Sequence, residues 1–196
     1  MNNNKTLWIG LLIAAVFGFW GMTSYNGLVD TEADVDSQWG NVQNAYQRRA
    51  DLIPNLVETA KGYANFEQGV LTQIAEARAQ VGKLTISKEN LSDPDMLRKF
   101  NEAQGQLGVA ASRLLSVAEN YPELKANTNF LALTAELAGS ENRISIERNK
   151  FNEAAKDYNK SVKKFPGSIF AKLFGFEEKA YFEAEAGAQS APKVKF

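Results

Sequence analysis

Apolar side chains recur along this chain at alternating steps of three and four residues, most regularly in its first third. The stripe there comprises Val35, Trp39, Val42, Tyr46, Arg49, Ile53, Leu56 and Ala60. These steps place the side chains on one side of an α-helix, as in the seam of a bundle or coiled coil. The pattern predicts a helix from about Asp30 to Lys61, and Arg49 is the charged member of its stripe.

A second helix is predicted shortly after the first one ends. Gly62 suits a C-terminal cap, and Asn65 with Gln68 three residues later resembles a capping box. The apolar pattern of this second helix fades near Lys83, and the polar residues 84–91 are predicted to form a loop. One continuous helix through Gly62 is the alternative.

Two longer helices complete the pattern. The third is predicted to begin at Asp93, an N-cap residue followed by Pro94 at the first helical position, and to end before Tyr121. The fourth is predicted from about Thr128 to residue 165 and keeps the three-four alternation throughout. The sequence therefore predicts an all-α fold, an antiparallel up-and-down four-helix bundle with long helices over residues 30–165.

An uncharged, largely apolar segment precedes the bundle, from Thr6 to Val29. As a helix it would span about 36 Å, enough to cross a hydrocarbon core of about 30 Å. A cleaved signal peptide is the alternative. The region before the segment holds one lysine, Lys5, no Ala-x-Ala site follows, and Trp20 and Tyr25 suit a membrane interface. These features favour an uncleaved single-pass transmembrane anchor in the cell membrane.

The charges on either side of the anchor predict its orientation. Lys5 precedes it, whereas four acidic residues follow it and the next basic residue is Arg48. The positive-inside rule then favours a cytoplasmic N-terminus and an exported body. Asn26-Gly27 is predicted to be a weak point between anchor and body. The predicted units are the short N-terminus and anchor (1–29), the helical bundle (30–165) and a C-terminal apolar segment with a tail (166–196).

Pro54 lies in the middle of the first body helix. It cannot donate the backbone hydrogen bond to residue 50, and its ring crowds that carbonyl group, so a helix kink is predicted there. The kink would be either a structural bend that packing holds in place or a functional hinge.

Two absences from the composition narrow the chemistry. The chain has no cysteine and no histidine, which excludes disulfides, thiol and Ser-His-Asp catalysis, histidine-ligated zinc and the Glu-x-x-His motif of di-iron bundles. No metal or cofactor site is predicted. The net charge of −1 and the lack of a lysine and arginine cluster argue against nucleic acid as a partner.

Three charged residues interrupt the apolar seams: Arg49 in the first body helix, and Glu141 and Arg148 in the fourth. If these two helices pack together, the three side chains form a candidate buried polar layer. Such layers usually fix the register of the helices. A ligand or ion site is the alternative.

Asp51 and Glu58 lie seven residues apart on one face of the first body helix. Paired carboxylates can perform acid-base catalysis when their pKa values are perturbed in a cleft. At this spacing, with Arg48 and Lys61 nearby, a solvated charged face is the competing interpretation.

The segment after the fourth helix is unusually apolar. Its candidate interaction patch comprises Ile169, Phe170, Leu173, Phe174 and Phe176. The patch could cover the open end of the bundle, lie in the membrane interface or bind a partner. Because four antiparallel helices would bring it back to the membrane, it is predicted to assemble copies of the chain through its three phenylalanines.

Several segments spread from end to end of the chain carry a resemblance to a known family. They are Tyr25-Asn26-Gly27-Leu28-Val29, Arg48-Arg49-Ala50-Asp51-Leu52-Ile53-Pro54-Asn55-Leu56-Val57, Tyr121-Pro122-Glu123-Leu124-Lys125-Ala126-Asn127, Glu141-Asn142-Arg143-Ile144, Phe165-Pro166, Gly175-Phe176 and Ala191-Pro192-Lys193-Val194-Lys195-Phe196. In these segments the chain resembles the LemA family. The resemblance implies a bacterial single-pass membrane protein with an antiparallel helical bundle and no established activity. One branch of the family is linked to magnetosome membranes, which suggests a membrane-organising role by analogy.

These observations predict a membrane-anchored scaffold or adaptor that is not an enzyme. The expected partners are membrane lipid, further copies of the chain and unidentified membrane or envelope proteins. The alternative function is a hydrolase-like enzyme with a carboxylate site in the bundle, or an accessory subunit of a membrane enzyme.

Overall fold

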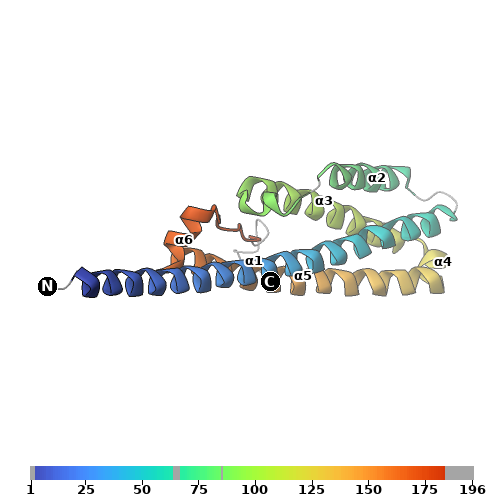
Figure 1. The fold of residues 1–196 in the computed structure, drawn as a ribbon. Helices are drawn as coiled ribbons and strands as arrows, with labels where there is room; N and C mark the ends of the chain where they lie inside the picture. Colours follow the sequence, from blue (N-terminus) through green and yellow to red (C-terminus); the bar gives the residue numbers. More distant parts are fainter. Residues whose placement is uncertain (1–2, 64–66, 85, 184–196) are drawn as a thin grey trace, which may run out of the picture.

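The computed structural model describes residues 3–63, 67–84 and 86–183, and these parts of the chain fold into helices without a β-strand (Figure 1). The all-α class predicted from the sequence is confirmed. The elements are α1 (Asn3–Lys61), α2 (Gln68–Lys83), the short 3₁₀ helix η1 (Glu89–Ser92), α3 (Pro94–Ala118), the one-turn α4 (Pro122–Lys125), α5 (Thr128–Lys163) and α6 (Gly167–Phe174).

The apolar N-terminal segment and the first body helix are one helix, α1. The predicted start at Asp30 and the predicted weak point at Asn26-Gly27 are therefore wrong. A glycine inside a helix costs only about 1 kcal/mol, and the next residue, Leu28, is 1% exposed. Burial of this leucine in the body holds the helix together across the junction.

The helices pack in two pairs: α1 lies along α5, and α2 lies along α3. Figure 1 shows the long α1–α5 pair as the axis of the molecule, with α2 and α3 on one side of it. The apolar stripe predicted in the first body helix faces this packing. Its buried members are Val35, Trp39, Val42, Tyr46, Arg49, Ile53, Leu56 and Ala60.

The buried side chains form two clusters along the axis. The cluster nearer the N-terminal segment is aromatic and centres on Trp39, Phe100, Phe151 and Tyr158. The other cluster is mainly aliphatic and lies towards the end of α1. Trp39 packs edge-on against Phe100 and Phe151, with ring centroids 5.6 and 5.8 Å away. Edge-on contacts between aromatic rings have a preferred geometry and contribute stability beyond that of the buried area.

The predicted boundaries of the third and fourth helices are confirmed within a few residues. The Asp93 side chain accepts hydrogen bonds from the amides of Asp95 and Met96, and Pro94 follows at the first helical position. Asn127 caps α5 by accepting a bond of 3.0 Å from the amide of Phe130. These caps satisfy amides that a helix start leaves without partners.

The first and second body helices are separate, as predicted, because α1 ends at Lys61 and α2 begins at Gln68. The predicted capping box is corrected: Gln68 is the first residue of the helix, and its N-cap is Glu67, whose side chain makes no capping bond. Asn65 lies outside the described residues. At Pro54 the helix continues, and in Figure 1 the last part of α1 rises away from the line of its first part.

The residues after α6 return along the body. Gly175 adopts a left-handed backbone, with φ of 77°, which a side chain would disfavour. Residues 177–183, which we call the strap, then lie against α5 and η1, and the amide of Ala180 donates a 2.8 Å bond to the carbonyl of Leu91. The described part of the C-terminal segment, through residue 183, thus packs against the body.

Candidate functional site

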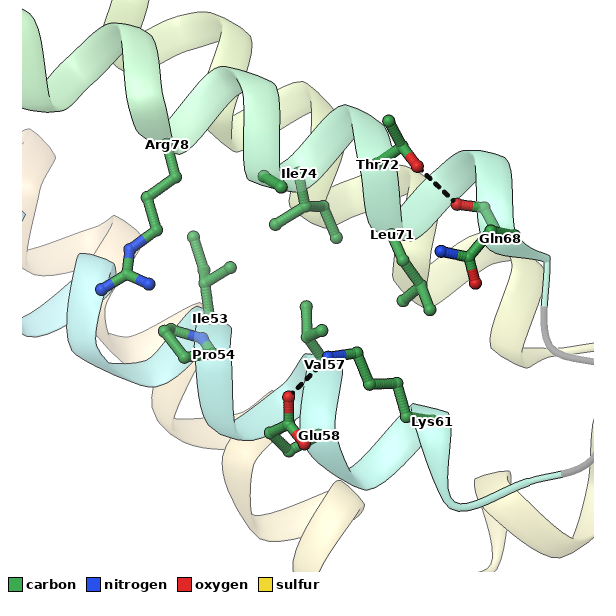
Figure 2. A pocket seen from close by; sticks show the side chains of 11 residues that line it. Ile53, Pro54, Val57, Glu58, Lys61, Gln68, Leu71, Thr72, Ile74 and Arg78 are labelled. Carbon is green, nitrogen blue, oxygen red and sulfur yellow. Dashed lines mark hydrogen bonds and ion pairs between the residues drawn. The ribbon is translucent and has the colours of Figure 1, made fainter.

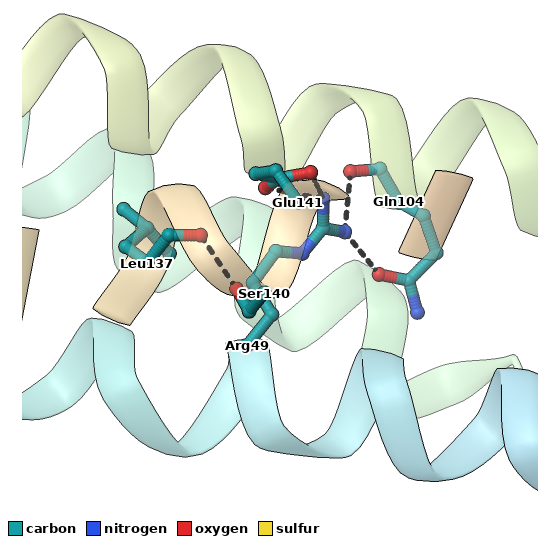
Figure 3. Close-up of polar contacts among 5 residues, drawn as sticks. All are labelled: Arg49, Gln104, Leu137, Ser140 and Glu141. Carbon is teal, nitrogen blue, oxygen red and sulfur yellow. Dashed lines mark hydrogen bonds and ion pairs between the residues drawn. The ribbon is translucent and has the colours of Figure 1, made fainter. Parts of the chain in front are cut away.

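The most polar point of the interior is Arg49, which projects from α1 between α3 and α5 (Figure 3). Its side chain is 4% exposed. Nη1 donates to both carboxylate oxygens of Glu141 at 2.9 and 3.2 Å, and Nη2 donates to the backbone carbonyl and side-chain oxygen of Gln104. Gly108 of α3 lies next to this group, since a Cβ built on it would be 3.4 Å from Nη1.

Two of the three residues of the predicted polar layer pair directly, and the third lies beside Tyr46, the ring that Arg49 covers. Arg49 and Glu141 meet, but Arg148 bonds to neither of them within the described part of the chain. Arg148 donates instead to the carbonyl of Glu183 at 2.9 Å and lies over the ring of Phe182 at 4.8 Å. Glu141 and Arg148 are seven residues apart on α5, about 10 Å along the helix. Arg49, which pairs with Glu141, therefore cannot contact the position of Arg148 in the same way.

The electrostatics around Arg49 favour a structural role. The carboxylate of Glu141 is 44% exposed, so the ion pair lies at the edge of the core. Burial raises the pKa of the neighbouring Tyr46, and the positive charges of Arg148 and Arg49 partly oppose that rise. The Tyr46 hydroxyl therefore stays protonated through neutral pH. The arrangement can fix the relative positions of α1, α3 and α5, as expected for a register device.

Asp51 and Glu58 lie on a solvated charged face rather than in a catalytic site. Asp51 accepts a 2.8 Å bond from Gln47, and Glu58 pairs with Lys61 at 2.7 Å. Both carboxylates are exposed on the surface. No group of three or more potential metal-ligating His, Cys, Asp or Glu side chains occurs within the part of the chain that the structure describes.

A groove of about 350 Å³ lies between the last turns of α1 and the first turns of α2 (Figure 2). Its apolar wall includes Ile53, Val57, Leu71 and Ile74, and the predicted kink residue Pro54 also lines it. Charged side chains border this wall, namely Glu58, Lys61 and Arg78. The combination of an apolar floor and a charged rim suits a protein segment better than a small charged metabolite.

The predicted C-terminal patch divides into two faces. Phe170 faces α1, because a Cβ on Gly21 would lie 3.1 Å from its ring. Tyr25 of α1 makes edge-on contacts with Phe174 and Phe176, with ring centroids 5.0 and 5.7 Å apart. Ile169 and Leu173 remain exposed on the opposite side of α6.

Two asparagines of α5 hold the strap, and sequence reasoning missed them. Asn159 donates to the carbonyl of Lys179 and accepts from its amide, both at 2.8 Å. Asn152 makes the same pair of bonds with Phe182, both at 2.9 Å. The asparagines are seven residues apart on the helix, about 10 Å, which matches three residues of extended chain. The seven-residue spacing of the two asparagines on a long helix was the sequence signal that could have indicated this role.

The side chains of the strap also contact both long helices. Lys179 is 9% exposed, pairs with Glu32 of α1 at 2.8 Å and lies over the ring of Tyr158. Phe182 joins the aromatic cluster, 5.4 Å from Phe151 and 6.2 Å from Trp39. The strap therefore closes the α1–α5 pair near the N-terminal segment.

Within the described residues, α1 is the helix that is long and apolar enough to cross a membrane, near its N-terminal end. The most apolar window has a mean hydropathy of 1.7, and none of it is buried by the rest of the chain. Apolar side chains from Leu7 to Met22 are accordingly exposed.

Comparison with known proteins identifies relatives of the chain. It is 26% identical to the magnetosome protein MamQ of Magnetospirillum gryphiswaldense, with 83% of this chain and 66% of that protein aligned. It is also 26% identical to the magnetosome protein MamQ 1 of Paramagnetospirillum magneticum, over 81% of this chain and 64% of that protein. The chain thus spans slightly less than two thirds of the magnetosome proteins.

A third relative is the protein LemA of Metamycoplasma hominis, which is 22% identical over 89% of this chain and 75% of its own length. The family model for the LemA family matches residues 38–196. This match includes α2 to α6 and most of the body part of α1. The chain therefore belongs to the LemA family.

Proposed function

We propose that this chain is a membrane-anchored scaffold or adaptor that acts by binding rather than by catalysis. The observation that carries the proposal is the continuity of α1, which joins the exposed apolar segment to the helical body. A body that shares a helix with its anchor is held at a defined orientation to the membrane. Membership of the LemA family and the names of the magnetosome relatives support a place at a membrane.

In this proposal the anchor crosses the cell membrane once. The body is an antiparallel four-helix bundle formed by the α1–α5 and α2–α3 pairs, and it lies on the exported side. Lys5 before the apolar segment and the acidic residues after it, from Asp30 to Asp36, support this orientation.

The groove between α1 and α2 is the proposed surface for membrane or envelope proteins. It lies at the end of α1 that is remote from the anchor, where a partner would not be obstructed by the membrane. Apolar grooves between helices commonly accept an amphipathic helix, and Glu58, Lys61 and Arg78 at the rim would orient its charges. The exposed positions of Asp51 and Glu58 favour this binding function over the enzyme alternative.

Self-association is the second part of the proposal. Copies tethered in one membrane meet at a high effective concentration, so weak contacts between bodies are sufficient for assembly. Substitutions of Phe170 and Phe176 are poorly suited to a test of self-association, since both side chains pack towards α1 of their own chain.

The test is capture of partners by the full chain solubilised from membranes in a mild detergent. A tagged copy is expected to bring down an untagged copy and a reproducible set of membrane or envelope proteins. Ala75→Trp should fill the groove and reduce capture of the proteins that bind there. Ala79→Trp is the matched control, because Ala79 is exposed on the same helix and does not line the groove.

Two results would contradict the proposal. A tagged chain that elutes as a monomer and captures neither an untagged copy nor another protein would argue against a scaffold. Equal capture by the Ala75→Trp and Ala79→Trp variants would remove the groove as the partner surface.

A further inference from the structure

The short helix α6 is fixed against the part of α1 that precedes the body. Ala171 is 1% exposed and anchors the inner side of α6. Phe170 lies against Gly21, and Phe174 and Phe176 contact the ring of Tyr25. These contacts come from α1 itself, so α6 has a fixed position along the helix axis. In Figure 1, α6 lies beside the N-terminal half of α1, apart from α2 and α3.

The outer side of α6 is apolar and uncovered. Leu173 is 71% exposed and Ile169 57%, and Phe165 just before the helix is 72% exposed. A helix of eight residues with this much exposed apolar surface is costly to leave in water. Lys172 and Lys164 are exposed close to these side chains.

The level of α6 relative to the membrane follows from the geometry of α1. Gly21 and Tyr25 precede Asp30, the first charged residue after the apolar segment, by nine and five residues. At 1.5 Å per residue, they lie about 13 and 8 Å closer to the membrane centre than Asp30. Amphipathic helices at a membrane surface are buried about 5–10 Å into the boundary between headgroups and acyl chains. The level of Tyr25, which contacts Phe174 of α6, falls within that range, and the level of Gly21 is slightly deeper.

We propose that the outer face of α6, formed by Ile169 and Leu173 with Phe165, inserts into the lipid leaflet beside the anchor. This inference rests on the anchor in the proposed function and adds a second membrane contact to it. Lys164 and Lys172 extend their ammonium groups to the lipid phosphates while their aliphatic stems lie in the interface. Helix α6 then holds the body against the membrane surface at a second point of contact next to the anchor.

Lipid is a better occupant for this face than a second copy of the chain. A stable protein interface usually buries more than about 1,000 Å², which Ile169, Leu173 and Phe165 by themselves do not provide. Lipid, in contrast, surrounds any chain whose anchor spans the bilayer. Tyrosine residues such as Tyr25 are also common at the interface level, where their amphipathic rings can pack between headgroups.

The test uses the full chain in vesicles of equal parts phosphatidylcholine and phosphatidylglycerol. Since the chain has no cysteine, single substitutions accept one polarity-sensitive fluorophore each. Leu173→Cys reports the outer face of α6, and Glu178→Cys, an exposed position in the strap, is the matched control. Phe17→Cys lies in the apolar segment and reports the anchor itself.

The label at Leu173→Cys is expected to show blue-shifted emission, quenching by brominated acyl chains and several-fold weaker quenching by aqueous iodide than the label at Glu178→Cys. The result should not change when the protein is diluted into more lipid. Equal emission and iodide access at the two positions would overturn the inference. Protection that disappears on dilution would also overturn it, because it would identify a second copy as the occupant.

The Phe17→Cys label separates this inference from the proposed function. If that label is not quenched by brominated acyl chains, the anchor itself fails. If it is quenched while the Leu173→Cys label is not, the anchor stands and the membrane contact of α6 is wrong.

Discussion

At the scale of single residues, Arg49 shows how a buried cation can be stabilised without a buried anion. Its planar guanidinium group offers donors in several directions, and three acceptors from two helices meet them: the Glu141 carboxylate, the Gln104 carbonyl and the Gln104 side chain. Glu141 remains partly in water, so it avoids most of the desolvation cost that a fully buried pair would incur.

Replacement of Arg49 tests this account. Arg49→Leu is expected to lower the free energy of unfolding by about 1–3 kcal/mol, mainly because the buried Gln104 loses its partner. The Arg49→Leu/Gln104→Leu double variant should recover part of the loss, and Glu141→Gln should cost less than about 1 kcal/mol because Glu141 is exposed. Denaturant unfolding measures all three. Losses that simply add in the double variant would mean that the two residues are not coupled.

Tyr158 predicts how the stability depends on alkaline pH. The residue is fully buried, and its hydroxyl has no hydrogen-bond partner within the described residues. Burial raises the pKa of Tyr158 well above its usual value, with the negative charge of Glu32 adding to the rise. The unfolded chain therefore loses this proton first, above about pH 10, so stability should fall as the pH increases beyond that value.

The expected result is that Tyr158→Phe removes part of this alkaline loss. At about pH 8 the variant should be as stable as the wild type or up to about 1 kcal/mol more stable, because an unpartnered hydroxyl leaves the core. Denaturant midpoints of the full chain in detergent, compared at about pH 8 and about pH 11, provide the measurement. The same alkaline loss in both proteins would contradict the assignment.

At the scale of elements, the periodicity of apolar residues and the helix caps predicted most of the helices, but nothing in the sequence analysis predicted the strap. The limits of α3 and α5 depend on Asp93 and Asn127, which act on amides two or three residues away. The strap has no such local signal, because its backbone bonds to asparagine side chains 20 and 30 residues earlier in the chain. The apolar tail was recognised, whereas its path along α5 was not.

The asparagine pair can be tested directly. Asn152→Ala and Asn159→Ala each remove an acceptor and a donor for buried strap backbone, and each should cost about 1–3 kcal/mol of stability. Amide hydrogen exchange should accelerate at Phe182 in the first variant and at Lys179 in the second. Asn149→Ala, an exposed asparagine on the same helix, is the matched control. Unchanged protection at both amides would show that the strap is held by its side chains.

At the scale of the whole molecule, one helix unites the apolar N-terminal segment with the body, so the two cannot be separated cleanly at Asp30. Leu28 is buried in the body, and Gly21 and Tyr25 support α6. The apolar segment thus has a structural role at its body end in addition to its proposed role as a membrane anchor.

Truncation tests both roles. Membranes washed with alkaline carbonate are expected to retain the full chain, whereas a chain that starts at Asp30 should be released into the aqueous fraction. The truncated chain should keep its helical circular dichroism, but α6 should exchange amide hydrogens faster because its contacts on α1 are gone. Release of the full chain by carbonate would contradict the anchor, and unchanged exchange in α6 would show that α5 alone holds it.

The sequence by itself determined the all-α class, the apolar N-terminal segment, the stripe of the first body helix, the Asp93 cap of α3, and Arg49 as the charge in the seam. These features depend on the spacing of residues within a few turns of helix, and this spacing can be read directly from the sequence. Only the tertiary structure decided that Gln104 joins Arg49 while Arg148 turns to the strap, that α6 has an inner and an outer face, and that Asn152 and Asn159 hold the returning chain. Each of these contacts joins residues distant in sequence, and the packing of the helices selects which of many compatible partners meet.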